Sequence, residues 1–392
     1  MVVEVRLSSI AKGGEAVARL DDGRVVFVRG GIPGELVEIE VTDDSHASWC
    51  RGVVTDVVEP STDRVTPPCP VAGLCGGCDW QHVGLARQRE LKAEIVVEQM
   101  RRLGRRRVDV TVEPVPGDAE GLGWRTRMRY LTDGDVVGLR GARSHELVPL
   151  PPSGCLLASA GGLSAGELVD LLQAAGLDGA AEICVTVADG VTVWSPGRGV
   201  LTGDEVVTQR APGRDYAVRA DGFWQVHPGA AEALSQAVLA GLKPQPGERA
   251  FDLYCGVGLF AGLLADCGAD VFALESDRAA TELARHNVPE AWFEVGRVER
   301  EPWPSEADLV VLDPPRSGAG RAVIERIAAS RPRAVAYVAC DEAALGRDTA
   351  LLAAQGYALS ELRAFDLFPM TSHVECVATF VADWTNALDL DH

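Results

Sequence analysis

From about residue 216 to the C-terminus, short apolar strands alternate with helices, and this alternation constrains the fold more than any other feature. RAFDL, VFALE, ADLVVL and AVAYVA are apolar along most of their length, and each precedes a helical stretch. Such strands are buried on both faces, which requires a parallel sheet covered by helices on both sides. Residues 216–392 are therefore expected to form an α/β, Rossmann-like domain.

The segment RAFDLYCGVGLFAGLLA contains a strand, a glycine-rich turn and a helix. Gly256 and Gly258 let the backbone approach a ligand at the helix N-terminus, and Glu275 ends the next strand, nineteen residues after Gly256. An acid at that place accepts hydrogen bonds from ribose hydroxyls. The pattern predicts a nucleoside cofactor. It leaves a dinucleotide and S-adenosylmethionine both open, because GVGLFA also satisfies a loose GxGxxA pattern.

Two later strands end in residues that carry chemistry. ADLVVLDPPRSG ends its strand at Asp313, and AVAYVAC ends its strand at Cys340. Parallel strands finish on one edge of the sheet, so both residues are expected at the cleft that holds Gly256. A lone cysteine is usually a small core residue, but this position predicts a nucleophile. Glu375, among apolar neighbours in the last strand, is either an edge charge or a base facing a pocket.

The first part of the chain has a different pattern. Residues 1–58 form short alternating segments separated by turns, with Asp22-Gly23 as a strong hairpin signal. This pattern predicts a small barrel of the oligonucleotide-binding kind, or a β-module without a ligand. Residues 59–215 open with PSTDRVTPPCPV, which marks a boundary, and are expected to contain helices over about 84–103 and 164–175.

Four of the ten cysteines predict a metal site. CPVAGLCGGCDWQH places Cys69, Cys75 and Cys78 in a C-x5-C-x2-C arrangement, and Cys155 follows a Pro/Gly turn in PPSGCLL. Four thiolates can hold tetrahedral zinc or an iron–sulfur cluster. The gap of five residues is longer than the gap in most zinc ribbons, which favours iron–sulfur.

Charge bounds the kinds of partner. The 392-residue chain has a net charge of −20, which argues against a broad, nonspecific grip on nucleic acid. RRLGRRR (101–107) and the arginines of GWRTRMRY (123–130) nevertheless form a basic strip, which is either an RNA-binding face or a solvated helix end. Apolar runs are too short for a membrane span and the N-terminus lacks a signal-peptide core, so a cytoplasmic protein is expected.

Together these motifs resemble the RNA (uracil-C5-)-methyltransferase family, in its branch with an N-terminal TRAM barrel and a [4Fe-4S] cluster. KGGEAVARLDDGRVVFVRGGIPGELVEIEV is similar to a TRAM barrel, and the four cysteines resemble the cluster ligands. GWRTRMRY, GFWQVHPGAA, DLYCGVGLF, DPPRSG, VAC and FPMTSHVE follow in the family's order. The resemblance covers nearly the whole chain.

The resemblance implies a TRAM barrel over 1–58, a central iron–sulfur α+β domain over 59–215 and a class I methyltransferase domain over 216–392. Cys340 would be the nucleophile and Glu375 the general base in methyl transfer to C5 of a uridine in RNA. The residues expected to contact S-adenosylmethionine are Gln225, Tyr254, Gly256, Gly258, Glu275 and Asp313. Ribosomal RNA of the 23S kind is favoured over transfer RNA by resemblance only, and a monomer is the default.

One position departs from the family pattern. Members usually have Asn-Pro after the nucleophile, whereas Asp341-Glu342 stand here. Extra negative charge beside a thiolate raises its pKa and slows attack unless a cation compensates. Arg316 and Arg347 are the candidates for that cation.

Three other functions remain open. A radical methylthiotransferase can also combine a TRAM barrel, a cluster and S-adenosylmethionine, but its cluster motif is C-x3-C-x2-C. An RNA-binding module with an inactive methyltransferase domain would account for the acidic pair. A nicotinamide dehydrogenase fits the glycine-rich turn and leaves Asp313 and Cys340 unexplained.

Overall fold

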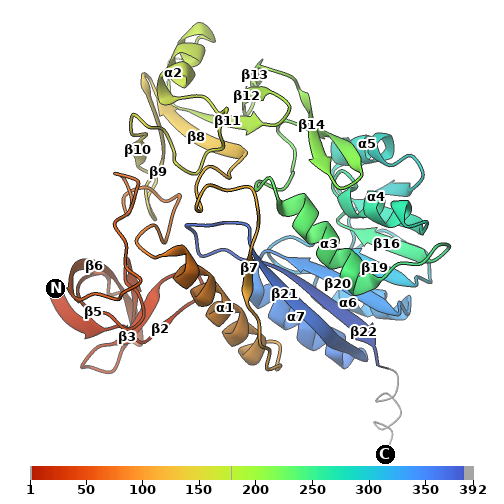
Figure 1. Ribbon diagram of the computed structural model, residues 1–392, viewed down its shortest axis with the longest axis horizontal. Helices are drawn as coiled ribbons and strands as arrows, with labels where there is room; N and C mark the ends of the chain where they lie inside the picture. The colour runs from red at the N-terminus through yellow and green to blue at the C-terminus, as the bar shows by residue number, and fades with distance from the viewer. Residues whose placement is uncertain (1, 178, 384–392) are drawn as a thin grey trace, which may run out of the picture.

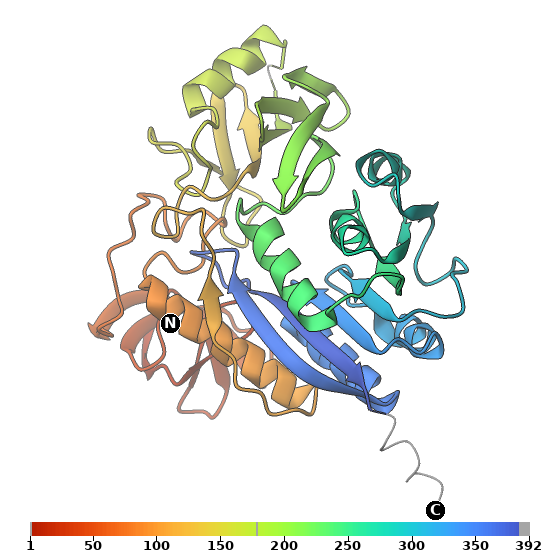
Figure 2. The same cartoon turned by 45° about the vertical axis from the view of Figure 1, so that its right-hand side comes forward.

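The computed structural model describes residues 2–177 and 179–383. Figure 1 shows an N-terminal barrel in red, a central sheet in yellow and light green, and a large C-terminal sheet in green and blue. Figure 2 shows that the helix α1 lies between the barrel and the C-terminal sheet. Within the described residues, no helix is both long enough and apolar enough to cross a membrane.

The barrel forms from short strands whose side chains alternate between a buried and an open face. Val26 and Val28 point inward from one strand and Ile39 from another, and all three are fully buried. The sheet order is β1-β5-β6-β4-β3-β2. Its strands are β1 (Val2–Arg6), β2 (Ser9–Ile10), β3 (Ala16–Arg19), β4 (Val25–Arg29), β5 (Leu36–Asp43) and β6 (Trp49–Glu59). The alternating pattern therefore predicted these strands correctly.

The central region is an antiparallel sheet with one helix against it. Helix α2 (Ala165–Ala174) begins with a capping box between Ser164 and Glu167, and its Leu168 and Leu172 pack on the sheet. The sheet order is β10-β9-β8-β11-β12-β13, and a separate hairpin follows. The strands are β8 (Arg127–Asp133), β9 (Val136–Arg140), β10 (Leu147–Pro149), β11 (Ala181–Val187), β12 (Val191–Ser195), β13 (Gly199–Thr202), β14 (Val206–Ala211) and β15 (Arg214–Arg219).

The C-terminal sheet is doubly wound. Its order is β18-β17-β16-β19-β20-β22-β21-β7, with β22 antiparallel between β20 and β21. Its strands are β7 (Val112–Pro114), β16 (Arg249–Leu253), β17 (Asp270–Glu275), β18 (Trp292–Val295), β19 (Leu309–Leu312), β20 (Ala334–Ala339), β21 (Tyr357–Asp366) and β22 (Glu375–Ala382). Its helices are α1 (Leu85–Arg102), α3 (Ala230–Leu242), α4 (Leu259–Asp266), α5 (Arg278–Asn287), α6 (Gly320–Ala329) and α7 (Glu342–Ala354).

The two faces of this sheet explain why its strands are apolar throughout. Val311 points into a core shared with α3, α4 and α5, whereas its neighbour Val310 points into a core shared with α1, α6 and α7. Both side chains are fully buried. The expected α/β fold with parallel strands covered on both faces is therefore confirmed.

Two elements from the middle of the chain join this C-terminal sheet. Strand β7 pairs in parallel with β21, and α1 packs in the same core as α7. The sheet thus includes residues that lie well before 216 in the chain. The expected domain boundary near 215 remains a prediction. The C-terminal sheet contains residues from both sides of it.

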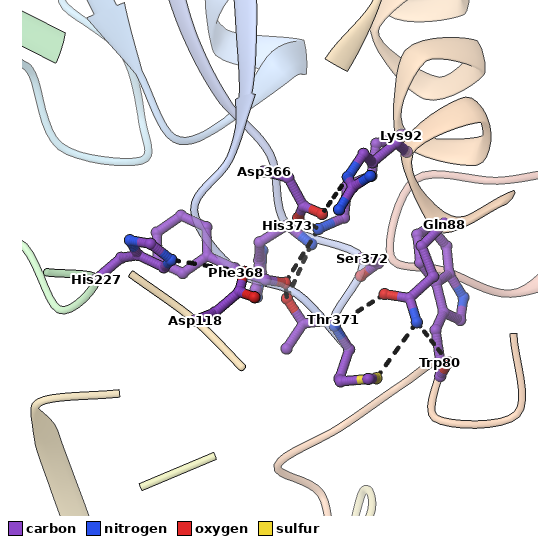
Figure 3. A network of polar contacts seen from close by, with 12 residues as sticks. Trp80, Gln88, Lys92, Asp118, His227, Asp366, Phe368, Thr371, Ser372 and His373 are labelled. Atoms are coloured by element: carbon purple, nitrogen blue, oxygen red, sulfur yellow. Dashed lines mark hydrogen bonds and ion pairs between the residues drawn. The ribbon is translucent and has the colours of Figure 1, made fainter. Parts of the chain in front are cut away.

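Helix α1 also holds the loop 367–374 that leads into β22 (Figure 3). The fully buried Lys92 ammonium donates to Asp366 Oδ1 at 2.5 Å and to the carbonyl of Phe368 at 3.0 Å. Gln88 accepts from the Met370 N–H at 2.8 Å through its side-chain oxygen. These bonds hold Met370 at a φ of +65°, which few non-glycine residues adopt.

We expect Lys92→Met to lower the stability of the chain, because the buried Asp366 carboxylate would lose its ion pair with Lys92 and keep only the longer contact with Arg89 Nε, at 3.3 Å. Removing one partner of a buried ion pair typically costs about 3–5 kcal/mol. The midpoint of urea unfolding measures the effect, with Lys243→Met as a control because Lys243 is exposed. The double variant Lys92→Met/Asp366→Leu should recover part of the loss, and a Lys92→Met chain as stable as the wild type would contradict this role.

Candidate active site

The glycine-rich turn after β16 opens on a cleft. Gly256 has a φ of +54°, and a Cβ placed on it would meet no atom within 4 Å. Gly258, at a φ of +91°, caps α4, and a Cβ there would approach the Phe293 ring to 3.2 Å. The two predicted glycines therefore differ: Gly256 leaves space for a ligand, and Gly258 allows the turn to pack.

Glu275 closes the turn from the next strand. Its carboxylate accepts from the Gly256 N–H at 3.1 Å, from the Asp277 N–H at 2.8 Å and from the Ser276 hydroxyl at 3.0 Å. These bonds hold the acid at the carboxyl end of β17, the strand next to β16. The order of the parallel strands reverses between β16 and β19. Ligands of doubly wound folds bind at such a point.

A cleft of about 760 Å³ brings most of the predicted site residues together. The predicted residues that line it are Tyr254, Gly256, Glu275, Asp313 and Cys340. The lining residues that sequence reasoning missed include Phe223, Arg297 and Glu299. Glu299 follows the carboxyl end of β18, a strand that the sequence analysis did not identify, and accepts from the Tyr254 hydroxyl at 3.4 Å.

Gln225 is buried close to the cleft but is not one of its lining residues. Its segment is held from the central sheet, because Thr126 donates through N and Oγ1 to the Val226 carbonyl at 2.9 Å in both cases. Arg127 donates to the carbonyls of Ala220 at 2.9 Å and Gly222 at 2.5 Å. Burial lowers the pKa of Arg127 to about 10. This arginine of GWRTRMRY is therefore a structural anchor and not part of an exposed basic strip.

The register of two strands places Cys340 beside Glu375. Ala339 at the end of β20 pairs with Cys376 in β22, so the next pair along the antiparallel ladder is Cys340 and Glu375. Residues opposite each other in such a ladder have Cα atoms about 4.5–5.5 Å apart. Cys340 is half-buried at the cleft, and Glu375 is 3% exposed. The thiol and the carboxyl group thus come from strands thirty-five residues apart in the chain.

The electrostatic environment raises the pKa of both groups in the free protein. Burial raises the pKa of Cys340 to about 11, with further contributions from the charges of Glu375 and Asp313, while Arg316 opposes the shift. Burial also raises the pKa of Glu375 well above its usual range, helped by Asp313 and Glu342. Desolvation raises the pKa of Asp313. Several carboxyl groups crowded in low dielectric cannot all ionise together.

The four predicted metal ligands line a single cavity, and all four are free thiols. The Gly77 N–H donates to Cys75 Sγ at 3.4 Å, and the Gln81 side chain donates to Cys78 Sγ at 3.2 Å. Burial raises the pKa of Cys78 to about 12. Across residues 2–177 and 179–383, however, no three His, Cys, Asp or Glu side chains form a group that could hold a metal ion. The iron–sulfur prediction is therefore not confirmed.

Of the other arginines of the basic strip, Arg125 is half-buried and the rest are exposed. Arg101 and Arg102 have more than half of their side chains exposed and pair with Glu98 of the same helix. Arg129 pairs with Glu182 at 3.2 Å. Arg101, Arg102 and Arg129 are thus partly neutralised, and the exposed Arg105, Arg106 and Arg107 follow the end of α1.

Fold and cleft together define a class I methyltransferase: a doubly wound sheet with β22 antiparallel, a glycine turn with an acid opposite it, and a cleft at the switch point. Comparisons with known proteins agree. Residues 1–48 match the TRAM domain model. An RNA methyltransferase of Streptomyces avermitilis, described as uncharacterized, is 43% identical and covers 96% of this chain and 97% of its own.

Two further similarities are more specific. The 23S rRNA (uracil(1939)-C(5))-methyltransferase RlmD of Shewanella sp. is 31% identical and covers 91% of both chains. The crystal structure of Pyrococcus abyssi tRNA (uracil-54, C5)-methyltransferase with S-adenosyl-L-homocysteine matches with a TM-score of 0.75, at 24% identity, over 96% of this chain and 99% of that one. The chain belongs to the RNA (uracil-C5-)-methyltransferase family, as its sequence motifs implied.

We expect alkylation of Cys340 by iodoacetamide to be slow at pH 7 and to rise steeply above pH 9, because its pKa is raised to about 11. Compared with an ordinary cysteine of pKa about 8.5, it would hold roughly 300-fold less thiolate at pH 7. Mass spectrometry of the peptide that contains Cys340 gives the rate, and the same peptide outside the protein is the control. Equal rates in the two would show an unperturbed thiol.

Proposed function

We propose that this chain transfers a methyl group from S-adenosylmethionine to C5 of a uridine in RNA through a covalent bond between Cys340 Sγ and C6 of the base. The observation that carries the proposal is the β20–β22 register, which sets the buried carboxyl group of Glu375 beside Cys340, a residue that lines the nucleoside cleft. The family to which the chain belongs supports the same reaction.

The residues around the cleft fit S-adenosylmethionine. Gly256 leaves open space at the turn, and Glu275 is held in place to accept hydrogen bonds from ribose hydroxyls. Tyr254 and Asp313 line the same cleft, and the buried Gln225 follows the exposed Phe223, another lining residue, by two positions. When bound, S-adenosylmethionine supplies a methyl group on a positively charged sulfur.

The chemistry needs one nucleophile and one base. C5 of uracil is a poor nucleophile, but addition of the Cys340 thiolate to C6 gives C5 enolate character, and C5 can then accept the methyl group. Glu375 takes the proton from C5. The electron pair of that bond re-forms the C5–C6 double bond, and the bond from C6 to sulfur breaks to return the thiolate. The raised pKa of Glu375 makes its carboxylate a stronger base once ionised.

We propose 23S rRNA as the substrate, since RlmD of Shewanella sp. resembles the chain over 91% of its length. In this proposal the barrel (1–58) and the central region (59–215) hold the RNA, and residues 216–392 carry out the transfer. The uridine must leave its stack, which costs least in a loop. Transfer RNA is the second candidate, named by the Pyrococcus abyssi neighbour.

Trapping on RNA that contains 5-fluorouridine tests this function. Fluorine replaces the proton that Glu375 would remove, so in the presence of S-adenosylmethionine the protein should stall as a covalent adduct with RNA. Denaturing gel electrophoresis detects the adduct, and Cys340→Ala should abolish it. Sequencing of the trapped RNA identifies the uridine and separates ribosomal from transfer RNA.

The variant Glu375→Gln provides a matched test on ordinary RNA, since the amide cannot take the C5 proton. We expect it to accumulate the same adduct without fluorine, with turnover reduced by about 100-fold or more, the usual contribution of a general base. If the wild type binds RNA and S-adenosylmethionine but forms no adduct, the chain acts as an RNA-binding module and Cys340 is a core residue.

We also propose that Cys69, Cys75, Cys78 and Cys155 hold a [4Fe-4S] cluster that orders the surrounding loops. The four thiols face one cavity, and N–H groups already point at two of the sulfurs. As placed, the thiols do not suit a single ion, whereas a cluster with iron at four corners bridges more widely separated sulfurs. We propose a structural role for the cluster, because the cavity joins the loop 69–81 to strands β9 and β10 of the central sheet.

Chain purified without oxygen should contain iron and inorganic sulfide in equal amounts. Cys78→Ser should lose both, because three thiolates hold such a cluster poorly, while Cys184→Ser, a cysteine outside the cavity, should keep both. Iron and sulfide assays give the result. Zinc in place of iron, or no metal at all in the wild type, would overturn the cluster proposal.

A further inference from the structure

The acidic residue after Cys340 is paired with a lysine from the far end of the chain. Lys12, in the loop between β2 and β3 of the barrel, donates through Nζ to the carboxylate of Asp341. The two residues are 329 positions apart. Neither Arg316 nor Arg347, the cations expected from the sequence, makes this bond: Arg316 lies at the cleft, and Arg347 donates to the Ser317 carbonyl at 3.4 Å.

The barrel loop that carries Lys12 is seated tightly on the catalytic part of the chain. The Trp80 indole N–H donates to the Gly14 carbonyl at 2.9 Å. A Cβ on Gly14 would come within 2.7 Å of the Ser372 side chain, so only glycine allows this approach. Ser372 belongs to the loop that leads into Glu375, and Asp79 holds it through Oδ2 at 3.0 Å from its N–H. Lys12 is therefore placed by close packing and not by a freely moving loop.

Asp341 also caps helix α7. Its Oδ1 accepts from the Ala344 N–H at 2.8 Å, and the helix begins at Glu342. The N-terminus of a helix carries a partial positive charge of about half a unit, which favours a thiolate placed beside it. An unpaired Asp341 carboxylate would more than cancel that charge. With Lys12 present, the balance beside Cys340 returns to positive.

The scarcity of lysine makes this placement notable. The chain has three lysines, Lys12, Lys92 and Lys243, against a total of 37 basic residues of the Lys and Arg kinds. Two of the three face carboxyl groups around Cys340 and Glu375: Lys12 at Asp341 and Lys92 at Asp366. Both also lower the pKa of the buried Glu342, which burial raises to about 7.

We propose that Lys12 is a positioning residue: by neutralising Asp341 it makes the ionisation of Cys340 depend on the seated N-terminal barrel. This inference rests on the proposed function, in which the Cys340 thiolate attacks uracil. It adds that the barrel contributes a charge to the active site as well as an RNA-binding surface. The charged groups that act on Cys340 are Glu375, Asp313 and Arg316. Those around Asp341 are Lys12, Arg347 and Glu342.

Four full-length variants test the proposal: Lys12→Met, Asp341→Asn, the double variant, and Lys243→Met as a matched lysine control. Asparagine caps a helix as well as aspartate does, so Asp341→Asn removes the charge and leaves α7 intact. The rate of alkylation of Cys340 by iodoacetamide, followed at several pH values without RNA or S-adenosylmethionine, reports its ionisation directly. Far-UV circular dichroism and the unfolding midpoint show that each variant is folded.

Lys12→Met should slow the alkylation of Cys340 by roughly threefold to tenfold at a fixed pH, the effect of one unit charge at a half-exposed place. Asp341→Asn should react at least as fast as the wild type, and the double variant should match Asp341→Asn. With RNA, kcat should follow the same order while KM changes little. Lys243→Met should match the wild type in both assays.

The opposite pattern would overturn the proposal. If the ion pair only fastens the barrel, Lys12→Met and Asp341→Asn should weaken RNA binding equally and leave the alkylation rate unchanged. A double variant as slow as Lys12→Met would have the same meaning. The alkylation assay needs no methyl transfer, so a failure of the proposed reaction would show in the fluorouridine trap and remain distinct from a failure of the role of Lys12.

Discussion

The antiparallel pairing of β22 between β20 and β21 is the constraint on which the candidate site depends. It alone sets Cys340 opposite Glu375, and a slip of one residue would turn Glu375 to the other face of the sheet. The register is secured from outside the sheet. Helix α1 binds the loop 367–374 through its backbone (Figure 3). Asp79 also accepts from the Ser372 N–H of this loop, so the strand enters the sheet at one defined residue.

Charge at the cleft follows from the same packing. Buried carboxyl groups at Asp313, Glu342 and Glu375 surround a half-buried thiol, and burial raises the pKa of each. Burial therefore favours the neutral forms of these groups, which cost less to bury than the charged forms. Ionisation then depends on nearby cations, of which Arg316 lies at the cleft and Lys12 comes from the barrel. The charge at the cleft therefore depends on residues from both the barrel and the C-terminal part of the chain.

Much of the fold and part of the site could be predicted from local patterns. The alternating and fully apolar strands indicated the barrel and the doubly wound sheet, since each pattern suits one kind of burial. The helix expected over about 84–103 is α1 (Leu85–Arg102). Convergence of Gly256, Glu275, Asp313 and Cys340 followed from one rule, that parallel strands end at the same edge. Glu299 was not predicted as a cleft residue, because the strand that precedes it, β18, has only four residues.

The sequence by itself determined which residues could form strands, turns and helices, because those depend on neighbours within a few positions. Only the tertiary structure decided that β7 and α1 join the C-terminal sheet, that Arg127 is buried against backbone carbonyls, and that Lys12 meets Asp341. These contacts join segments up to 329 residues apart. No local pattern predicts them, because the neighbouring sequence of a charged residue is the same whether its side chain faces solvent or pairs with a distant residue.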